Sequence, residues 1–170
     1  SLPVVGTALL LIDVINDLDF EGSEALVRQV PAMAERIASL KVRARAAGIP
    51  VVFINREPSA EDMELNGNFC YVGADARQSG TMQGNIVLAT ESKGDLNGNG
   101  KVDYVMIVGD PENPDAQYRT EFSIKALTDA GVEVNKLVDN VGNWDQTKGQ
   151  EIAAAALAQF GDEVEVIFCN

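Results

Sequence analysis

Short apolar runs alternate with longer segments of mixed polarity along this chain. Residues 8–12 form a continuous apolar run that is followed by Asp13, which is typical of a buried strand that ends at a polar edge. Residues 23–47 then predict a helix. Pro31 can disturb its early turns, and Gly48 can end it in left-handed backbone. The same alternation predicts strands at 50–55, 71–73, 104–108, 134–138 and 164–168, and helices at 77–92, 115–130 and 145–160.

The order of these elements predicts the fold class. Strands that alternate with helices need crossover connections, and these connections produce a parallel sheet. We therefore predict an α/β fold with a doubly wound, mostly parallel sheet and helices on both faces, of the Rossmann-like or flavodoxin-like type. The carboxyl ends of such strands carry site residues, and they hold Asp13, Asn55, Asp110 and Asn170 here. We expect residues 1–170 to form one domain, because two isolated three-stranded halves would each bury little core.

Charge and hydropathy restrict the class of partner. The chain has 170 residues, of which 26 are acidic and 13 basic, so its net charge of −13 argues against binding to nucleic acid. Cations are more suitable partners. No apolar run approaches the ~20 residues that cross a bilayer, and no signal-peptide pattern is present. We therefore expect a soluble chain with no membrane or targeting segment.

Histidine and cysteine usage removes most catalytic chemistry. Histidine is absent, which excludes Ser-His and Cys-His catalytic pairs and histidine-based metal sites. Cys70 and Cys169 fit neither a disulfide framework nor a zinc pattern. Because both have apolar neighbours, we expect two small core residues.

One segment, DLNGNGKVD at residues 95–103, has the spacing of an EF-hand-type calcium loop. Its oxygen donors are Asp95, Asn97, Asn99 and Asp103 at positions 1, 3, 5 and 9, and the carbonyl of Lys101 at position 7. This spacing predicts calcium binding, and a Gly/Asn-rich surface turn before a strand is the alternative. Position 12 is Met106 in place of the usual bidentate glutamate, so the last ligand must come from elsewhere.

The beginning of the chain suggests a hydrolase. ALLLIDVINDLDFEGSEAL and RARAAGIPVV, in about the first 50 residues (1–50), resemble the start of the isochorismatase-like cysteine hydrolases. The resemblance implies that Asp13 would activate a catalytic cysteine with the help of a lysine. No segment of this chain carries that later lysine or a cysteine at a helix start, and an aspartate after a strand is also a common turn residue. We therefore expect no catalysis.

Residues 51–170 resemble another family. VVFINREPSAEDM, YVGADARQSGTMQG, DLNGNGKVDYVMIVGDPENPDAQYRTEFSIKAL and VGNWDQTKGQ are similar to the galactose/glucose-binding periplasmic proteins. In that family the calcium loop takes its last ligand from a later strand, and Glu165 matches this position. The resemblance therefore implies calcium as a structural clasp, held by Asp95, Asn97, Asn99, the Lys101 carbonyl, Asp103 and Glu165.

The same resemblance implies a hexose site between two lobes, where polar side chains bind sugar hydroxyls and aromatic rings cover the apolar sugar face. The matching residues are Asn55, Asp115, Arg119 and Trp144, with Asn113 where well-known members carry histidine. Asp13 and Phe20 lie near the place of a further aspartate and aromatic residue. Each match has a structural alternative: Asp115 can cap a helix, Arg119 can pair with a carboxylate and Trp144 can fill a gap between helix and sheet. We expect at best a partial cleft with weak hexose binding.

Two unrelated resemblances in one chain suggest that segments of two different proteins have been fused. The first parent favours the cytoplasm and the second the periplasm or an extracellular location, so we predict an engineered chimera that retains a calcium site and has no enzyme activity. A weak galactose or glucose binder and a residual hydrolase are the alternatives. Because residues 72–76 cross between lobes in the sugar-binding family, two truncated lobes are the alternative to one merged sheet. We expect a monomer, or a dimer that completes its sheet edges by exchange.

Overall fold

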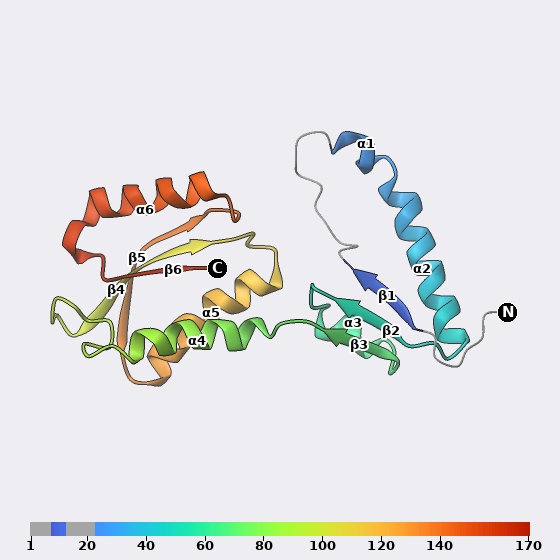
Figure 1. Ribbon diagram of the computed structural model, residues 1–170, viewed down its shortest axis with the longest axis horizontal. Helices are drawn as coiled ribbons and strands as arrows, with labels where there is room; N and C mark the ends of the chain where they lie inside the picture. The colour runs from blue at the N-terminus through green and yellow to red at the C-terminus, as the bar shows by residue number, and fades with distance from the viewer. Residues whose placement is uncertain (1–7, 13–22) are drawn as a thin grey trace. The chain divides into compact units, whose positions relative to one another are not determined.

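The computed structural model describes residues 8–12 and 23–170 (Figure 1). Two compact units divide the chain, Ser1–Gly73 and Ala74–Asn170, and each holds its own three-stranded sheet. The expectation of one domain with a merged sheet is therefore wrong for the described residues, because each sheet has its own covering helix and its own core. Asp13 and Phe20 lie outside the described residues.

The first unit is a parallel sheet of order β1-β2-β3 with helices in its connections. Its elements are β1 (Leu9–Ile12), α1 (Glu24–Val27), α2 (Val30–Ala46), β2 (Val51–Ile54), α3 (Ala60–Glu64) and β3 (Phe69–Val72). Ala44 of α2 packs on Val51 of β2 at the centre of the core. The rings of Phe53 and Phe69 lie edge to face at 5.3 Å, and the Lys41 ammonium lies 5.6 Å from each ring centroid.

Two details of this unit differ from the predicted elements. The helix expected at residues 23–47 is split into α1 and α2, and Pro31 lies in the first turn of α2, where its missing N–H leaves no hydrogen bond unmade. Gly48 follows α2 with a φ of +68°, as predicted for a residue that ends a helix. The short helix α3 was not predicted, although Ser59 caps it by accepting a hydrogen bond from the Asp62 N–H at 3.0 Å.

The second unit is a parallel sheet of order β5-β4-β6 (Figure 1). Its elements are α4 (Ala76–Leu88), β4 (Lys101–Val108), α5 (Pro114–Asp129), β5 (Glu133–Val141), α6 (Gln146–Phe160), the 3-10 helix η1 (Gly161–Glu163) and β6 (Val166–Cys169). The alternation of helix and strand places α4 and α5 on one face of this sheet and α6 on the other (Figure 1). The predicted α/β fold with parallel strands and helices on both faces is confirmed for this unit.

The central strand β4 supplies the core of the second unit because successive side chains point to opposite faces. Tyr104 and Met106 pack with Leu127 of α5 on one face. Val105 and Ile107 pack with Ala156 of α6 on the other. All six of these apolar residues are buried, and all but Ile107 are at most 6% exposed, so β4 is a strand buried on both sides.

Close packing of α4 against α5 depends on two glycines. A Cβ added at Gly84 would lie 2.5 Å from the carbonyl oxygen of Ser123 and 2.6 Å from the Cβ of Ala126. A Cβ at Gly80 would lie 2.8 Å from the carbonyl oxygen of Arg119. These helices therefore approach at a distance that only a residue without a side chain permits.

Both cysteines are exposed, in contrast to their predicted place in a core. Cys70 follows Phe69 on β3, so it points to the sheet face opposite α2. Cys169 ends β6, which is an outer strand of its sheet. Within the described residues, none of the helices has the length and apolar character needed to cross a bilayer.

Candidate functional site

The segment from Asp95 to Asp103 curls around the first of its carboxylates, between α4 and β4. Asp95 Oδ1 accepts hydrogen bonds from the N–H groups of Gly98 at 2.8 Å and Asn99 at 3.1 Å. Its Oδ2 accepts from the Gly100 N–H at 3.0 Å. Gly98 and Gly100 have φ values of +74° and +92°, so glycine permits the tight turn at both positions.

The two asparagines of this loop stabilise the same curl. Asn97 Oδ1 accepts a hydrogen bond from the Asn99 N–H at 3.0 Å, and Asn99 Oδ1 accepts from the Lys101 N–H at 3.0 Å. Each side chain thus binds the backbone two residues later, as asparagine commonly does in turns. The side-chain oxygens at positions 1, 3 and 5 therefore all accept hydrogen bonds from backbone N–H groups of the loop.

Glu165 reaches this loop from the segment that precedes β6. Its Oε1 accepts hydrogen bonds from the N–H groups of Leu96 at 2.6 Å and Asn97 at 2.8 Å, and its Oε2 accepts from the Asp103 N–H at 2.8 Å. The Glu165 N–H donates in return to the Asp103 carbonyl at 3.0 Å. The distant carboxylate that the resemblance implied therefore contacts both ends of the loop.

Asp103 is the most buried of the loop carboxylates, with 3% of its surface exposed. Its Oδ1 accepts a hydrogen bond from Asn135 Nδ2 and lies 3.3 Å from Lys101 Nζ, while its Oδ2 accepts from Asn99 Nδ2 at 2.9 Å. Burial alone would raise the pKa of Asp103, but the hydrogen bonds from Asn135, Asn99 and Lys101 outweigh it and hold the pKa below its ordinary value. The folded protein therefore favours the ionised form.

The donor chemistry of this loop suits calcium, which binds hard oxygen ligands. The candidate donors are the side chains of Asp95, Asn97, Asn99, Asp103 and Glu165 and the Lys101 carbonyl. In the described part of the chain, no three His, Cys, Asp or Glu residues are grouped as a metal site. The carboxylates of Asp95 and Glu165 instead face backbone N–H groups, so ion binding would require them to turn inward and approach one another.

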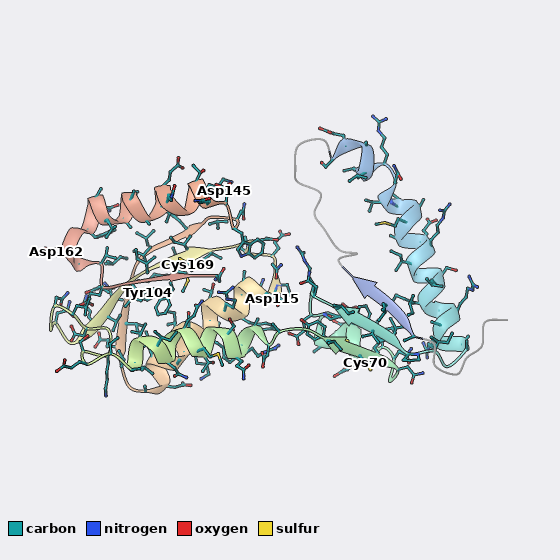
Figure 2. All side chains as sticks on the ribbon, in the orientation of Figure 1. Cys70, Tyr104, Asp115, Asp145, Asp162 and Cys169 are labelled. Carbon is teal, nitrogen blue, oxygen red and sulfur yellow. The ribbon has the colours of Figure 1, made fainter. Side chains whose placement is uncertain are left out.

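A second polar cluster lies at the carboxyl ends of the strands in the same unit. Asn113 caps α5 by accepting a hydrogen bond from the Asp115 N–H at 2.9 Å. Arg119 donates from Nη2 to the carbonyl of Cys169 at 3.4 Å, whereas its buried Nε has no hydrogen-bond partner among the described residues. Figure 2 shows Asp115 at the start of α5 and Cys169 at the end of β6. A buried donor of this kind is available to a ligand.

Asn170 links the elements around this cluster. Its Oδ1 accepts a hydrogen bond from the Gly109 N–H at 2.7 Å, after β4, and its Nδ2 donates to the Ala116 carbonyl of α5 at 3.2 Å. It also donates to Thr120 Oγ1. The sequence placed Asn170 at a strand end, but only the fold reveals that it ties β6 to α5 and to the end of β4.

Trp144 lies in the connection between β5 and α6, with a φ of +56°. A Cβ at Gly109 would lie 2.3 Å from Trp144 Cε2, so the indole ring covers the end of β4 where only glycine fits. The residue is 52% exposed. Trp144 therefore exposes about half of its surface to solvent, whereas a residue that fills a gap between helix and sheet would be buried.

Asn55 is the one candidate sugar residue in the first unit. It follows β2 with a φ of +80°, and its carbonyl accepts a hydrogen bond from the Tyr71 hydroxyl at 3.0 Å. Positive φ is uncommon for a residue other than glycine, although asparagine tolerates it better than most. The other four candidates, Asn113, Asp115, Arg119 and Trp144, belong to the second unit.

Comparison with known proteins identifies relatives that are named as binding proteins. The D-galactose/methyl-galactoside binding periplasmic protein of Haemophilus influenzae is 33% identical over 165 residues, which cover 93% of this chain and 49% of that protein. A putative rhizopine-binding protein of Rhizobium meliloti is 27% identical over 176 residues, covering 97% of this chain and 54% of the relative. This chain thus spans about half the length of these curated relatives.

Solved structures share the fold. A glucose-galactose binding protein from Geobacillus stearothermophilus superposes with a TM-score of 0.55 at 19% identity, over 72% of this chain and 39% of its own. A periplasmic solute binding protein from Actinobacillus succinogenes, solved with D-allose bound, gives a TM-score of 0.57 at 20% identity. The superposition covers 75% of this chain and 42% of that protein. At this identity the likeness establishes the α/β fold alone.

A family model described as periplasmic binding protein domain matches residues 13–170. Because one family match spans residues 13–170, it gives no support to a hydrolase origin for residues 13–50 or to a junction near residue 50. The expectation of an engineered chimera is corrected accordingly. The expectation that the chain is not an enzyme agrees with the relatives, which are named as binding proteins. The chain belongs to the periplasmic binding protein domain family.

Proposed function

We propose that this chain is a sugar-binding part of a periplasmic binding protein and that its ligand is a hexose such as galactose or glucose. The observation that carries the proposal is the 33% identity, over 93% of this chain, to a galactoside-binding relative. The family also supports a periplasmic location. Because the chain spans about half of that relative, the proposal concerns the residues present and their share of a sugar site.

The cluster at the carboxyl ends of β4 and β6 has suitable chemistry for a sugar. Arg119 supplies a guanidinium whose buried Nε has no hydrogen-bond partner within the described residues. Trp144 supplies a half-exposed aromatic ring against Gly109. Sugar hydroxyls accept hydrogen bonds from such donors, and the apolar face of a pyranose packs on aromatic rings. Asn113 and Asp115 are the further polar candidates of this cluster.

Tryptophan fluorescence tests this proposal directly, because Trp144 is the sole tryptophan of the chain. We expect a saturable change in its emission on titration with galactose or glucose. Arg119→Gln should weaken binding roughly 10- to 100-fold, because a hydrogen bond to a charged group contributes about 1.5–3 kcal/mol. Arg45→Gln, on the exposed surface of α2, removes the same charge and should bind as the wild type does.

Far-UV circular dichroism of each variant checks that it is folded. An unchanged Trp144 signal at high concentrations of both sugars would overturn the hexose proposal. Asn55 belongs to the first unit, so its contribution is measured separately. The sugar affinity of Asn55→Ala is determined by the same fluorescence titration. Loss of affinity in this variant would add Asn55 to the site, and an unchanged affinity would remove it.

A second proposal concerns calcium, which we infer to be held by the loop at residues 95–103 together with Glu165. The observation that favours it is the contact of Glu165 with both ends of this loop. The ligands would be Asp95, Asn97, Asn99, the Lys101 carbonyl, Asp103 and Glu165. When bound, the ion would offset the mutual repulsion of three carboxylates and join the start of β4 to the start of β6.

Thermal unfolding with calcium and with a chelator tests this second proposal. An ion that binds only the folded state stabilises it by about 2.7 kcal/mol at a concentration of 100 Kd, so calcium should raise the melting temperature. Glu165→Gln should abolish the rise, while Glu163→Gln, an equal charge change on η1, should preserve it. A melting temperature that calcium leaves unmoved, or a calcium effect that survives Glu165→Gln, would contradict the assignment.

A further inference from the structure

Asn135 contacts the proposed calcium loop from a different strand. It lies on β5 directly opposite Asp103 in the register of β4 and β5. Because paired residues on neighbouring strands point to the same face, the two side chains meet, and Asn135 Nδ2 donates to Asp103 Oδ1 at 2.5 Å. Asn135 is outside the spacing pattern of the loop, so its sequence position gives no indication of this contact.

The contact fixes the orientation of a buried carboxylate. Asp103 is 3% exposed, so its oxygens depend on protein partners. Asn135 holds Oδ1 from the side of the sheet, and Asn99 of the loop holds Oδ2 at 2.9 Å. With Oδ1 held on the sheet, the carboxylate keeps Oδ2 turned toward the loop.

The geometry points to Asn135 as a positioning residue of the calcium site, one that acts through Asp103. This inference rests on the calcium proposal above. Outer partners that orient a ligand commonly change metal affinity about 10- to 100-fold when they are removed. Asn135 also extends the site to a third strand: Asp103 belongs to β4, Glu165 precedes β6, and Asn135 adds β5. Ion binding is then coupled to the whole sheet of the second unit.

The amide at this position suits the role better than a carboxylate does. The amide Nδ2 donates a hydrogen bond, which a carboxylate oxygen needs, whereas an aspartate would present a second negative charge to Asp103. Lys101 Nζ already supplies the charge partner of Asp103 Oδ1 at 3.3 Å. Because the Asn135 amide is neutral, it donates a hydrogen bond to Asp103 without adding a further charge next to the carboxylate that would bind the ion.

Calcium titration against a competing chelator, with the whole chain, tests the role of Asn135. Asn135→Leu has nearly the same shape but no donor, and Asn135→Ser is a second variant that keeps a polar side chain too short to reach. Both should bind calcium about 10- to 100-fold more weakly than the wild type. Asn140→Leu makes the same change at an exposed position of β5 and should leave the affinity unchanged.

An Asp103→Asn background separates positioning from general stability. If Asn135 acts through Asp103, Asn135→Leu should weaken calcium binding in the wild type and have no further effect on binding in Asp103→Asn. A merely structural residue would lower the melting temperature equally with calcium and with chelator and would leave the affinity unchanged, which overturns the inference. If the wild type itself binds no calcium, the calcium proposal fails and this inference fails with it. Wild-type binding with an unaltered Asn135→Leu affinity overturns only the role of Asn135.

Discussion

The two units use the same alternation of strand and helix but bury their sheets to different extents. In the second unit, β4 is enclosed by α4 and α5 on one face and α6 on the other, and its residues 102–107 are all buried. In the first unit, α2 packs on one face of the sheet, while Leu10 and Val72 remain 55% and 60% exposed. A parallel strand order therefore does not by itself produce a core on both faces of a sheet. Because helices cover both faces of β4, the second unit is the more rigid of the two for holding a binding site.

The largest expected difference between the units is the cost of removing an apolar side chain. Leu127 is fully buried in the second unit, so Leu127→Ala should destabilise it by about 2–5 kcal/mol. Leu10→Ala, at a 55% exposed position of the first unit, should cost under about 1 kcal/mol. Urea denaturation followed by far-UV circular dichroism, which detects both units, measures the two losses of stability. Equal losses for the two variants would contradict the difference in burial.

Glycine substitutions should distinguish the helix layers within the second unit. Gly84→Ala would place a Cβ 2.5 Å from the Ser123 carbonyl oxygen, so we expect a loss of about 1–3 kcal/mol from overpacking between α4 and α5. Gly149 lies in α6 with open space around it, so Gly149→Ala should stabilise by about 0.5–1 kcal/mol. Denaturation curves of the two variants should therefore shift in opposite directions. A neutral Gly84→Ala would show that the two helices separate easily.

Acid should weaken the second unit through Asp103. Its folded pKa lies below the ordinary value of 3.8, so its ionised form contributes stability above that value, and this stability is lost as the pH falls through the folded pKa. Asn135→Leu removes one of the hydrogen bonds that lower the pKa, so its loss of stability should begin at higher pH. Acid titration followed by Trp144 fluorescence measures both midpoints. Identical midpoints would exclude this contribution of Asn135.

Surface ion pairs should have the smallest effect. Lys125 Nζ lies 2.8 Å from Asp129 Oδ2 on α5, but the two side chains are 50% and 62% exposed. Solvent screens such a pair, so Lys125→Gln should change the stability of the second unit by less than about 0.5 kcal/mol. A larger loss in urea denaturation would indicate that Lys125 makes contacts beyond this pair.

The alternation of apolar runs and helical segments predicted the fold class and the approximate place of most elements, since each run is long enough to form one strand. It failed to predict α3, because five residues provide no helical period and Ser59 is the only local signal. The small size of each half favours one domain, but the close packing of α4 on α5 offsets that small size in the second unit. That packing depends on Gly80 and Gly84 and gives the second unit a core of its own.

The candidate sites were only partly accessible from sequence. The spacing of residues 95–103 identified the loop, but Glu165 came from a family resemblance, because its distance along the chain carries no local signal. Asn135 was missed because only the register of β4 and β5 brings it to Asp103. The hydrolase interpretation of residues 1–50 is not supported, because a strand followed by aspartate and a helix recurs in many α/β folds and the family match includes residues 13–50.

Two-dimensional ¹H-¹⁵N NMR during a titration with galactose locates any hexose site residue by residue. We expect saturable shifts at the Trp144 indole, at the Arg119 side chain and at the end of β6, with the resonances of residues 95–103 little changed. Calcium should produce the reverse pattern. Saturating galactose that leaves Trp144 and Arg119 unshifted, or shifts confined to other parts of the chain, would contradict the proposed sugar site.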